Sequence, residues 1–275
     1  MRAVHEAADT HPPEQDDADD DPRVSVIVPA IDEEDRLPRA LASVGHDEQV
    51  EVIVVDGGSR DGTVAIAEAA GARVIHSPPG RGVQMNAGAQ RASAPVLLFL
   101  HADTCLPPRW QQHVDRCLSE PNVAGGAFRL AFNSSHPGLR LIAAGANCRA
   151  SLRHLPYGDQ AIFVRRDTFV ELEGFGALPI MEDYQFIRRL RRRGRIAIAP
   201  EPVTTSGRRW MDNGLCRTTL VHQCLLIGWH LGVPAEQLAR WRQPRVGSAI
   251  RDAVARRLAA VAAPFAKGEH DDRHV

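Results

Sequence analysis

Polar side chains that could do chemistry follow several apolar segments of this sequence. "VLLFLHADT" ends in His101 and Asp103, which are two residues apart and therefore point to the same face of an extended chain. A carboxylate at this point could hold a divalent cation, because Mg²⁺ typically binds one or two carboxylates together with substrate phosphates. The alternative is that Asp103 or Thr104 only starts the helix that the following prolines permit.

A second acidic pair stands at the predicted start of a helix. "GALPIMEDYQFIRRL" places Glu182 and Asp183 side by side after a loop that contains glycine and proline. Acidic residues in a first helical turn complement the helix dipole, which is one interpretation. The other is that one of the two is a general base, which must lie within hydrogen-bond reach of a transferring proton.

A third candidate is the turn in "VIVVDGGSRDGT". Asp56 lies at the tip of a strand and could accept hydrogen bonds from a base or ribose in a nucleotide pocket. The alternative is a turn in which Gly57 and Gly58 supply unusual backbone angles and Asp61 caps the next helix. The chain has neither GxGxxG nor GxxxxGK[ST], so it lacks the fingerprints of dinucleotide and P-loop sites.

Two arginines and a tryptophan form a fourth candidate. Arg208, Arg209 and Trp210 in "SGRRW" follow a strand, and we expect them in a polar loop that binds a diphosphate or an acceptor. The arginines of "RRLRRRGR" are better explained as a solvated helix face.

The elements around these residues predict an α/β fold. Strands that are apolar on both faces alternate with helices, which is typical of a mostly parallel sheet covered by helices. The expected strands are 24–30, 50–58, 73–77 and 94–103, and the expected helices between them are 36–44, 61–72 and 81–93. Ligands of such sheets bind at the carboxyl ends of the strands, where the polar tips lie.

The rest of the chain is less regular. We expect strands at 124–132 and 160–166 and helices at 138–152, 181–195 and 214–233. The predicted organisation has a disordered acidic tail at 1–22, a catalytic domain at 23–205, a helical C-terminal extension of the same domain at 206–246 and a loosely attached helical tail at 247–275.

Composition limits the partners and the compartment. The 275 residues are 44% hydrophobic and 24% charged, and the net charge of −1 gives no attraction to nucleic acid, so we expect no nucleic-acid partner. Five cysteines without metal-type spacing and the lack of a recognisable signal peptide predict a cytoplasmic protein. The apolar stretch Leu220–Leu231 could touch the inner membrane face peripherally, although such helices more often pack into the core.

The motifs taken in order resemble glycosyltransferase family 2. They are "SVIVPAIDEEDRLPRALASV", "EVIVVDGGSRDGT", "GRGVQMNAGAQRASAPVLLFLHADT", "GDQAIFVRR" and "MEDYQFIRRL", and the resemblance covers about residues 23–245. "RGVQMNAG", "LLFLHADT", "GDQAIFVRR" and "TSGRRW" are closest to a subgroup of short bacterial members, the selenodomain-associated or arsenosugar-biosynthesis glycosyltransferases.

The resemblance implies a GT-A (Rossmann-like) fold and an inverting transfer of sugar. The donor would be a UDP- or GDP-sugar, the acceptor a hydroxyl of a small molecule or lipid, and the cofactor a divalent cation, Mg²⁺ or Mn²⁺. In the family's DxD motif this chain has His101 at the first position and Asp103 at the second. Asp183 would be the catalytic base and Glu182 its supporting neighbour.

The resemblance also assigns the remaining site residues. A nucleotide would contact Pro29, Ile31, Glu33, Asp56, Gly58, Ala102, Arg81 and Asn86, the last two near the ribose or diphosphate, and the diphosphate or acceptor would contact Asp159, Gln160, Arg208, Arg209 and Trp210. "SGRRW" is similar to the QxxRW motif of processive synthases, but Ser206 replaces the glutamine.

Two alternative functions stay open. A nucleotidyltransferase shares the sheet and the metal-held nucleotide, but it usually carries a glycine-rich basic loop after the first strand, where this chain has the acidic "PAIDEED". A catalytically weak sugar-nucleotide-binding protein would bind the same ligand without depending on Asp183.

Overall fold

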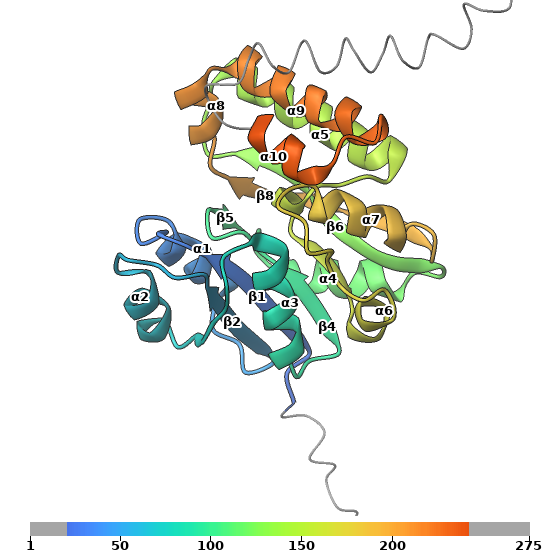
Figure 1. Ribbon diagram of the computed structural model, residues 1–275. Helices are drawn as coiled ribbons and strands as arrows, with labels where there is room; N and C mark the ends of the chain where they lie inside the picture. Colours follow the sequence, from blue (N-terminus) through green and yellow to red (C-terminus); the bar gives the residue numbers. More distant parts are fainter. Residues whose placement is uncertain (1–20, 242–275) are drawn as a thin grey trace, which may run out of the picture.

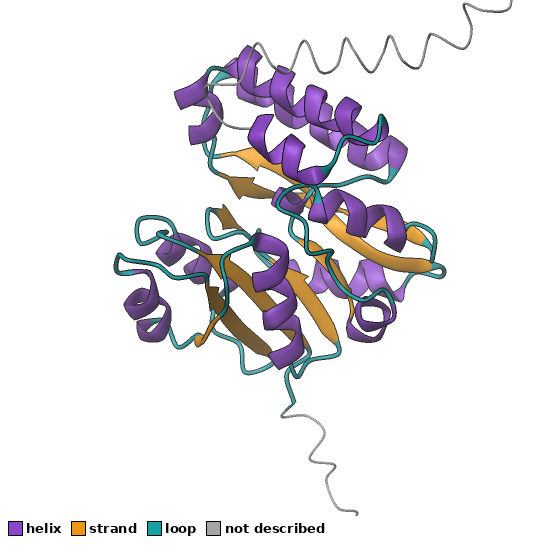
Figure 2. Cartoon of the chain, viewed as in Figure 1, coloured by secondary structure: helices purple, strands orange, loops and turns teal. Residues whose placement is uncertain are grey.

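The computed structural model describes residues 21–241, and within them one mixed sheet of eight strands is flanked by helices, as predicted. The strand order is β3-β2-β1-β4-β7-β6-β8-β5. Figure 2 shows helices on both sides of this sheet. Residues 1–20, which make up most of the predicted acidic tail, and 242–275, which include the predicted helical tail, lie outside the described residues.

The first half of the sheet is parallel and matches the prediction closely. It contains β3 (Arg73–His76), β2 (Val50–Asp56), β1 (Val24–Ala30) and β4 (Val96–Phe99), connected by α1 (Leu37–Val44), α2 (Thr63–Ala69) and α3 (Arg81–Arg91). β1 is buried over nearly its whole length because helices cover both of its faces. α3 packs directly on β1, since Gly88 has no side chain where a Cβ would lie 2.4 Å from Ile27.

The second half of the sheet mixes parallel and antiparallel pairs, a detail that the sequence analysis did not predict. β7 (Ile162–Arg165) runs antiparallel to β4 and to β6 (Val123–Phe132), whereas β8 (Arg195–Thr205) is parallel to β6, and β5 (Thr104–Cys105) pairs antiparallel with β8. An apolar strand buried on both faces has the same pattern in either direction, so the sequence could not reveal this. The consequence is functional: β7 begins at the edge where β4 ends, and residues just before β7 therefore reach the site.

Helices complete the second half. They are α4 (Trp110–Ser119), α5 (Pro137–Arg153), α6 (Arg166–Glu171), α7 (Glu182–Leu190), α8 (Arg208–Asn213), α9 (Leu215–His230) and α10 (Ala235–Trp241), with a 3₁₀ turn, η2 (Gly158–Gln160), before β7. Figure 1 shows α5, α8, α9 and α10 together at one end of the molecule, beyond the end of β8. α9 and α10 approach closely because Gly228 lies against Leu238 and Trp241.

The apolar stretch that raised the question of a membrane contact forms most of α9. Leu225 is buried there, but Leu220 and Ile227 on the same helix are exposed. No helix within residues 21–241 combines the length and the apolar character needed to cross a bilayer.

Candidate active site

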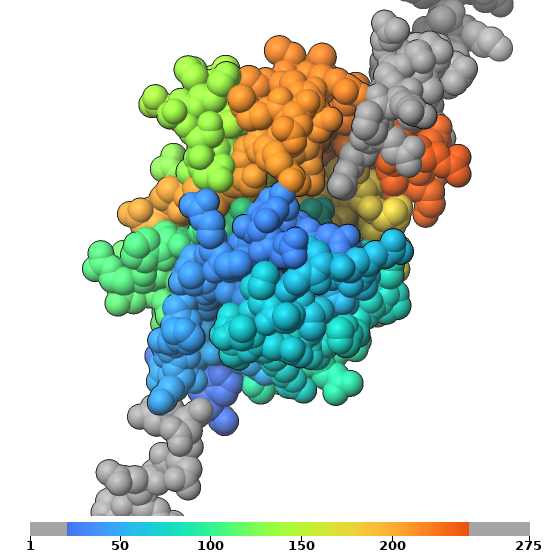
Figure 3. All heavy atoms as spheres, turned by 90° about the vertical axis from the view of Figure 1, so that its left-hand side faces the viewer, coloured from blue at the N-terminus to red at the C-terminus, as the bar shows by residue number. Residues whose placement is uncertain are grey.

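A cavity of about 240 Å³ lies where the two halves of the sheet meet, at the ends of β1 and β4. Figure 3 shows the face on which the blue first half of the chain meets the orange segment that contains α8 and α9. Nine of the residues predicted for the site line the cavity: Glu33, Arg81, His101, Asp103, Asp159, Asp183, Arg208, Arg209 and Trp210. They come from segments far apart in the sequence, so the fold has brought most of the predicted site together.

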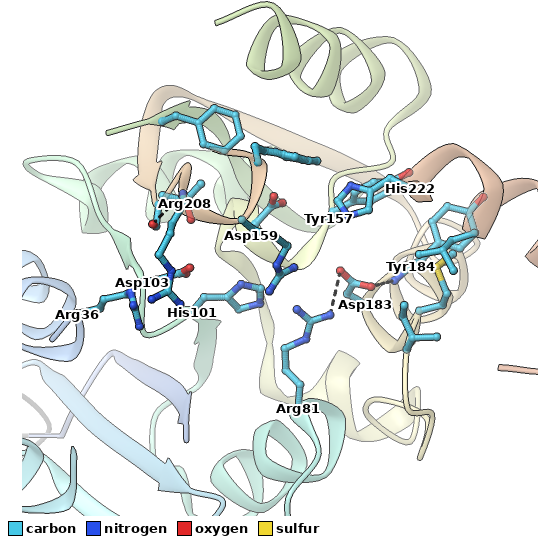
Figure 4. Close-up of a pocket in the computed structure, with 18 of the residues that line it drawn as sticks. Arg36, Arg81, His101, Asp103, Tyr157, Asp159, Asp183, Tyr184, Arg208 and His222 are labelled. Atoms are coloured by element: carbon cyan, nitrogen blue, oxygen red, sulfur yellow. Dashed lines mark hydrogen bonds and ion pairs between the residues drawn. The ribbon is translucent and has the colours of Figure 1, made fainter. Parts of the chain in front are cut away.

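Asp183 occupies the centre of this cavity (Figure 4). It stands in the first turn of α7, directly after Met181 and Glu182, and Met181 has a left-handed backbone with φ of 70°. Its carboxylate accepts hydrogen bonds from the backbone amides of Gly158 and Tyr184, each at 2.7 Å. Burial raises the pKa of Asp183, but Arg81 and these two amides outweigh it, so the pKa lies below its usual range. Asp183 is therefore a carboxylate at neutral pH and can accept a proton.

Glu182 lies outside the cavity lining, unlike its neighbour Asp183. Its carboxylate is 2% exposed, does not line the cavity and forms an ion pair with Arg81 from the start of α3. Arg81 in turn lies 3.9 Å from Asp183, measured from Nη2 to Oδ2. Burial lowers the pKa of Arg81, but the charges of Glu182 and Asp183 raise it further, so the guanidinium stays charged. Glu182 thus holds the arginine that faces the cavity.

His101 and Asp103 lie together on another side of the cavity (Figure 4). The His101 Nε2 atom is buried and has no hydrogen-bond partner among residues 21–241. Burial and the charge of Arg81 lower the pKa of His101 to about 4, so the ring is neutral and Nε2 can act as a ligand. Asp103 is half-buried beside it.

These two side chains fit a divalent cation that takes its other ligands from phosphate and water. No cluster of three or more metal-type side chains occurs within the described part of the chain. Mg²⁺ commonly binds one or two carboxylates plus substrate phosphates, and Asp103 supplies one carboxylate of that pattern. The unpartnered imidazole of His101 is a softer ligand, of the kind that transition-metal ions accept more readily than Mg²⁺ does.

Asp159 enters the cavity because it stands in η2, just before antiparallel β7. Its Oδ1 atom is buried and finds no donor within residues 21–241. Burial raises the pKa of Asp159 to about 6. Its neighbour Gln160 is fully buried, donates to the Phe128 carbonyl at 2.9 Å and does not line the cavity. Gln160 therefore fastens the turn that presents Asp159.

The loops after β1 and β2 form a rim beside the cavity, and they are joined by side-chain to backbone hydrogen bonds. The amide of Arg60 donates to Asp32 at 2.8 Å, that of Gly62 to Glu34 at 2.7 Å, and that of Glu33 to the Thr63 hydroxyl at 2.8 Å. Hydrogen bonds within the chain thus hold this rim together.

Asp56 stabilises its own turn within this rim. Its carboxylate accepts from the amides of Gly58 and Ser59 at 3.0 and 3.1 Å and lies 3.3 Å from His76 Nδ1. Of the alternative turn, Gly58 has the expected positive φ of 101° but Gly57 does not, and the N-cap residue of α2 is Gly62 rather than Asp61. Contact of Asp56 with a base stays a prediction. The same holds for four predicted nucleotide contacts that do not line the cavity: Pro29, Ile31, Gly58 and Ala102.

Asn86 also lies outside the cavity lining. Its side chain donates to the Phe175 carbonyl at 2.8 Å and accepts from the Phe175 amide at 2.9 Å. The amide group is thus engaged in joining α3 to the loop before α7, and contact with a ribose or diphosphate stays a prediction.

The "SGRRW" segment differs from the expected polar loop. Ser206 and Gly207 turn the chain after β8, and Arg208 begins the short helix α8, with its amide 3.3 Å from the Ser206 hydroxyl. The N-cap residue of α8 is Gly207, and the Ser206 hydroxyl just before it accepts from the Arg208 amide. Both arginines and Trp210 still line the cavity.

Several lining residues were missed by sequence analysis. Arg36 lies 2.7 Å from Glu33 in an i,i+3 pair beside Asp103, and no motif marked it. The others are mostly aromatic or aliphatic: Phe132, Tyr157, Ile180, Met181, Tyr184, Thr205, Ser206, His222, Leu225 and Leu226. Apolar residues on helices have the same pattern whether they face a core or a cavity, so only the fold identifies them.

Solved structures with a similar fold include proteins in complex with nucleotide-sugars. A mannosyltransferase from Pyrobaculum calidifontis, in complex with GDP-Man and Mn²⁺, is 18% identical with a TM-score of 0.59, over 90% of this chain and 76% of that one. S. aureus TarS in complex with UDP-GlcNAc is 17% identical with a TM-score of 0.52, over 67% of this chain and 58% of that one. The fold is therefore that of the GT-A glycosyltransferases, which confirms the predicted fold class.

Sequence comparison gives the family. The model of "Glycosyl transferase family 2" matches residues 25–171, which is more than half of the chain. The chain belongs to glycosyl transferase family 2.

Curated relatives match a shorter segment. An uncharacterized glycosyltransferase of Mycobacterium tuberculosis is 36% identical over 81 residues, which is 29% of this chain and 36% of that protein. The 4,4'-diaponeurosporenoate glycosyltransferase of Staphylococcus haemolyticus is 36% identical over 89 residues, 29% of this chain and 24% of that protein. The match thus spans about a third or less of these relatives.

Proposed function

We propose that this protein moves a sugar from a nucleotide-sugar to an acceptor hydroxyl with inversion, and that Asp183 is the general base. The observation that carries the proposal is that Asp183, Arg81, His101 and Asp103 line one cavity, with Arg81 3.9 Å from Asp183. This arrangement offers a proton acceptor next to groups that can bind phosphate.

The donor diphosphate would contact the charged side of the cavity. Arg36, Arg81, Arg208 and Arg209 provide positive charge there, and charge stabilisation is usually the largest catalytic contribution. Asp103 and His101 would hold Mg²⁺ or Mn²⁺. The solved P. calidifontis mannosyltransferase is in complex with GDP-Man and Mn²⁺. When bound, a divalent cation supplies charge that offsets the negative charge of a leaving diphosphate.

Asp183 would take the acceptor proton. The acceptor oxygen forms a bond to the anomeric carbon while the bond from that carbon to the diphosphate oxygen breaks. The electron pair leaves with the diphosphate, and the hydroxyl proton passes to the Asp183 carboxylate. One displacement from the face opposite the diphosphate inverts the configuration. Arg81, held by Glu182, keeps the carboxylate ionised before the reaction.

The donor is identified by thermal-shift and turnover assays with UDP- and GDP-sugars, with and without Mn²⁺ or Mg²⁺. A ligand that binds only the folded state raises the melting temperature by mass action, so a slow enzyme would also reveal its donor. We expect stabilisation by one sugar nucleotide that increases with the cation.

The role of Asp183 is tested by Asp183→Asn, with Asp115→Asn on the exposed face of α4 as the matched control. Loss of a general base lowers turnover by about 10²- to 10⁴-fold. We expect that loss in Asp183→Asn alone, with donor binding retained. Full activity of Asp183→Asn would exclude this base, whereas binding without turnover in the wild type would favour the catalytically weak binding protein.

Two narrower assignments depend on other observations. The nucleotidyltransferase alternative would be supported by release of pyrophosphate from a nucleoside triphosphate and by no stabilisation with nucleotide-sugars. The likeness to the selenodomain-associated or arsenosugar-biosynthesis subgroup rests on the motifs quoted above, and gene neighbourhood would test it.

A further inference from the structure

The side of the cavity away from His101 and Asp103 is apolar. In Figure 4, Tyr157, Tyr184 and His222 lie on one side of Asp183, while His101 and Asp103 lie on the other. The lining of this apolar side, which we call the acceptor wall, consists of Tyr157, Ile180, Met181, Tyr184, Leu225 and Leu226, with His222 beside it. These residues come from the segment before β7, the start of α7 and the middle of α9.

Packing between rings and a cation holds this wall in place. The Tyr157 and Tyr184 rings pack edge to face with centroids 6.1 Å apart, and the guanidinium of Arg149 lies 3.5 Å from the centroid of Tyr157. The backbone amide of Tyr157 also donates to Gln160 Oε1 at 3.2 Å. These contacts within the chain fix the position of the Tyr157 ring.

The hydroxyl of Tyr157 is the unusual feature of this wall. Its oxygen is buried and has no hydrogen-bond partner in the part of the chain that the structure describes. A buried hydroxyl without a partner costs free energy, so such a group within a cavity indicates a partner that arrives with the ligand. Burial also raises the pKa of Tyr157 to about 12, and the hydroxyl therefore keeps its proton and can donate it in a hydrogen bond.

We infer that the acceptor wall binds an acceptor whose reacting hydroxyl is carried on a predominantly apolar body, and that the Tyr157 hydroxyl donates a hydrogen bond to that acceptor. The inference rests on the proposed function, because Asp183 lies at the junction of the wall and the charged side. A polyhydroxylated acceptor such as a sugar would place hydroxyls against Ile180, Met181, Leu225 and Leu226, where they would lose water without gaining partners. An apolar body loses nothing there and gains burial.

The class of acceptor is tested by competition between alcohols. The donor identified above is held at saturation, and transfer is measured to benzyl alcohol and geraniol as apolar probes and to glycerol and methyl glucoside as polar probes. We expect kcat/KM for the apolar probes to exceed that for the polar probes by at least about tenfold, since hydroxyls placed against apolar walls lose water without gaining hydrogen bonds.

The wall itself is tested by two substitutions and a matched control. Tyr157→Phe removes one hydroxyl and should raise KM for benzyl alcohol by about five- to tenfold, as expected for loss of one hydrogen bond. Leu226→Gln places an amide in the wall and should raise the same KM by at least about threefold. Leu220→Gln makes the same change on the exposed face of α9, where Leu220 is 64% exposed, and should leave it unchanged.

The outcomes separate this inference from the proposed function. The KM for the donor and the thermal shift with the sugar nucleotide should be the same in all three variants. If the donor binds and is turned over but the polar probes are preferred, or if Leu226→Gln behaves as Leu220→Gln, the acceptor inference is wrong and the transferase stands. If no nucleotide-sugar binds at all, the proposed function fails, and the inference fails with it.

Discussion

The two sides of the cavity differ in how their side chains are held. On the side of β1 and β2, hydrogen bonds fix the loops, as between Arg60 and Asp32 at 2.8 Å. On the side of α7 to α9, ring packing fixes the wall, as between Tyr157 and Tyr184 with centroids 6.1 Å apart. Hydrogen bonds constrain direction as well as distance, whereas apolar packing mainly constrains shape. A donor diphosphate needs directed contacts, and a variable acceptor needs a fitted surface, so the difference matches the two tasks.

Removing the buried charge of Glu182 should have the largest effect on stability. Glu182→Gln leaves Arg81 with only its longer contact to Asp183, at 3.9 Å, and breaking a fully buried ion pair costs about 3–5 kcal/mol. The Arg81 side chain is 35% exposed, so we expect a smaller loss of unfolding free energy, about 2–3 kcal/mol. Urea unfolding measures it.

The control for this change is an exposed pair of the same type. Glu171→Gln breaks the contact with Arg193, in which both side chains are more than half exposed, and should cost less than about 0.5 kcal/mol. Equal losses in the two variants would mean that burial of the Arg81–Glu182 pair does not support the charged side of the cavity.

The sequence predicted most of the charged residues of the cavity but not the apolar residues of the acceptor wall. Asp103, Asp183 and Arg208 were found because charged residues at strand and helix ends are uncommon in a core and follow recognisable motifs. Tyr157 and Leu226 were not found, because an apolar residue on a helix or before a strand has the same pattern whether it faces a core or a cavity. The direction of β7 was also hidden, since burial on both faces removes the alternation that would distinguish it.

Asp159 permits a pH-dependent test of the charged side. Its pKa is about 6 in the folded protein and 3.8 in an unfolded chain, so the folded state binds the proton more tightly. Its contribution to stability therefore falls as pH rises from 4 to 6. Asp159→Asn removes the cost of burying the ionised carboxylate. We expect the free energy of unfolding at pH 8 to rise by about 1–2 kcal/mol, a value discounted because the residue is only half-buried.

The gain in Asp159→Asn should decrease as pH falls through 6 and disappear near pH 4, where the wild-type carboxyl is protonated. Melting temperatures across this range measure it, with Asp115→Asn on the exposed face of α4 as the control. A gain in stability that is the same at pH 4 and pH 8 would show that burial does not raise the pKa of Asp159.

A smaller effect should distinguish how tightly helices pack in the two halves of the chain, with α3 in the first half and α5 in the second. At Gly88 in α3, an added Cβ would lie 2.4 Å from Ile27 and 3.0 Å from Val55. Gly88→Ala should therefore destabilise the protein by about 1–2 kcal/mol, because overpacking exceeds the gain in helix propensity. Urea unfolding checks the sign, and a stabilised variant would mean that α3 can move away from the sheet without loss.

The smallest effect is expected at Gly145, a glycine within helix α5 in the second half of the chain. Gly145 is exposed, and no atom of the described chain lies within 4 Å of the position of its Cβ, apart from the helix's own backbone and chain neighbours. Gly145→Ala should stabilise the protein by about 0.5–1 kcal/mol through helix propensity alone. The same substitution thus has opposite signs in the two helices, because α3 is pressed against the sheet that carries the charged loops whereas this face of α5 is open. If urea titration instead shows that Gly145→Ala lowers the free energy of unfolding, part of the protein covers this face of α5. That result would contradict the contrast between Gly88 in α3 and Gly145 in α5.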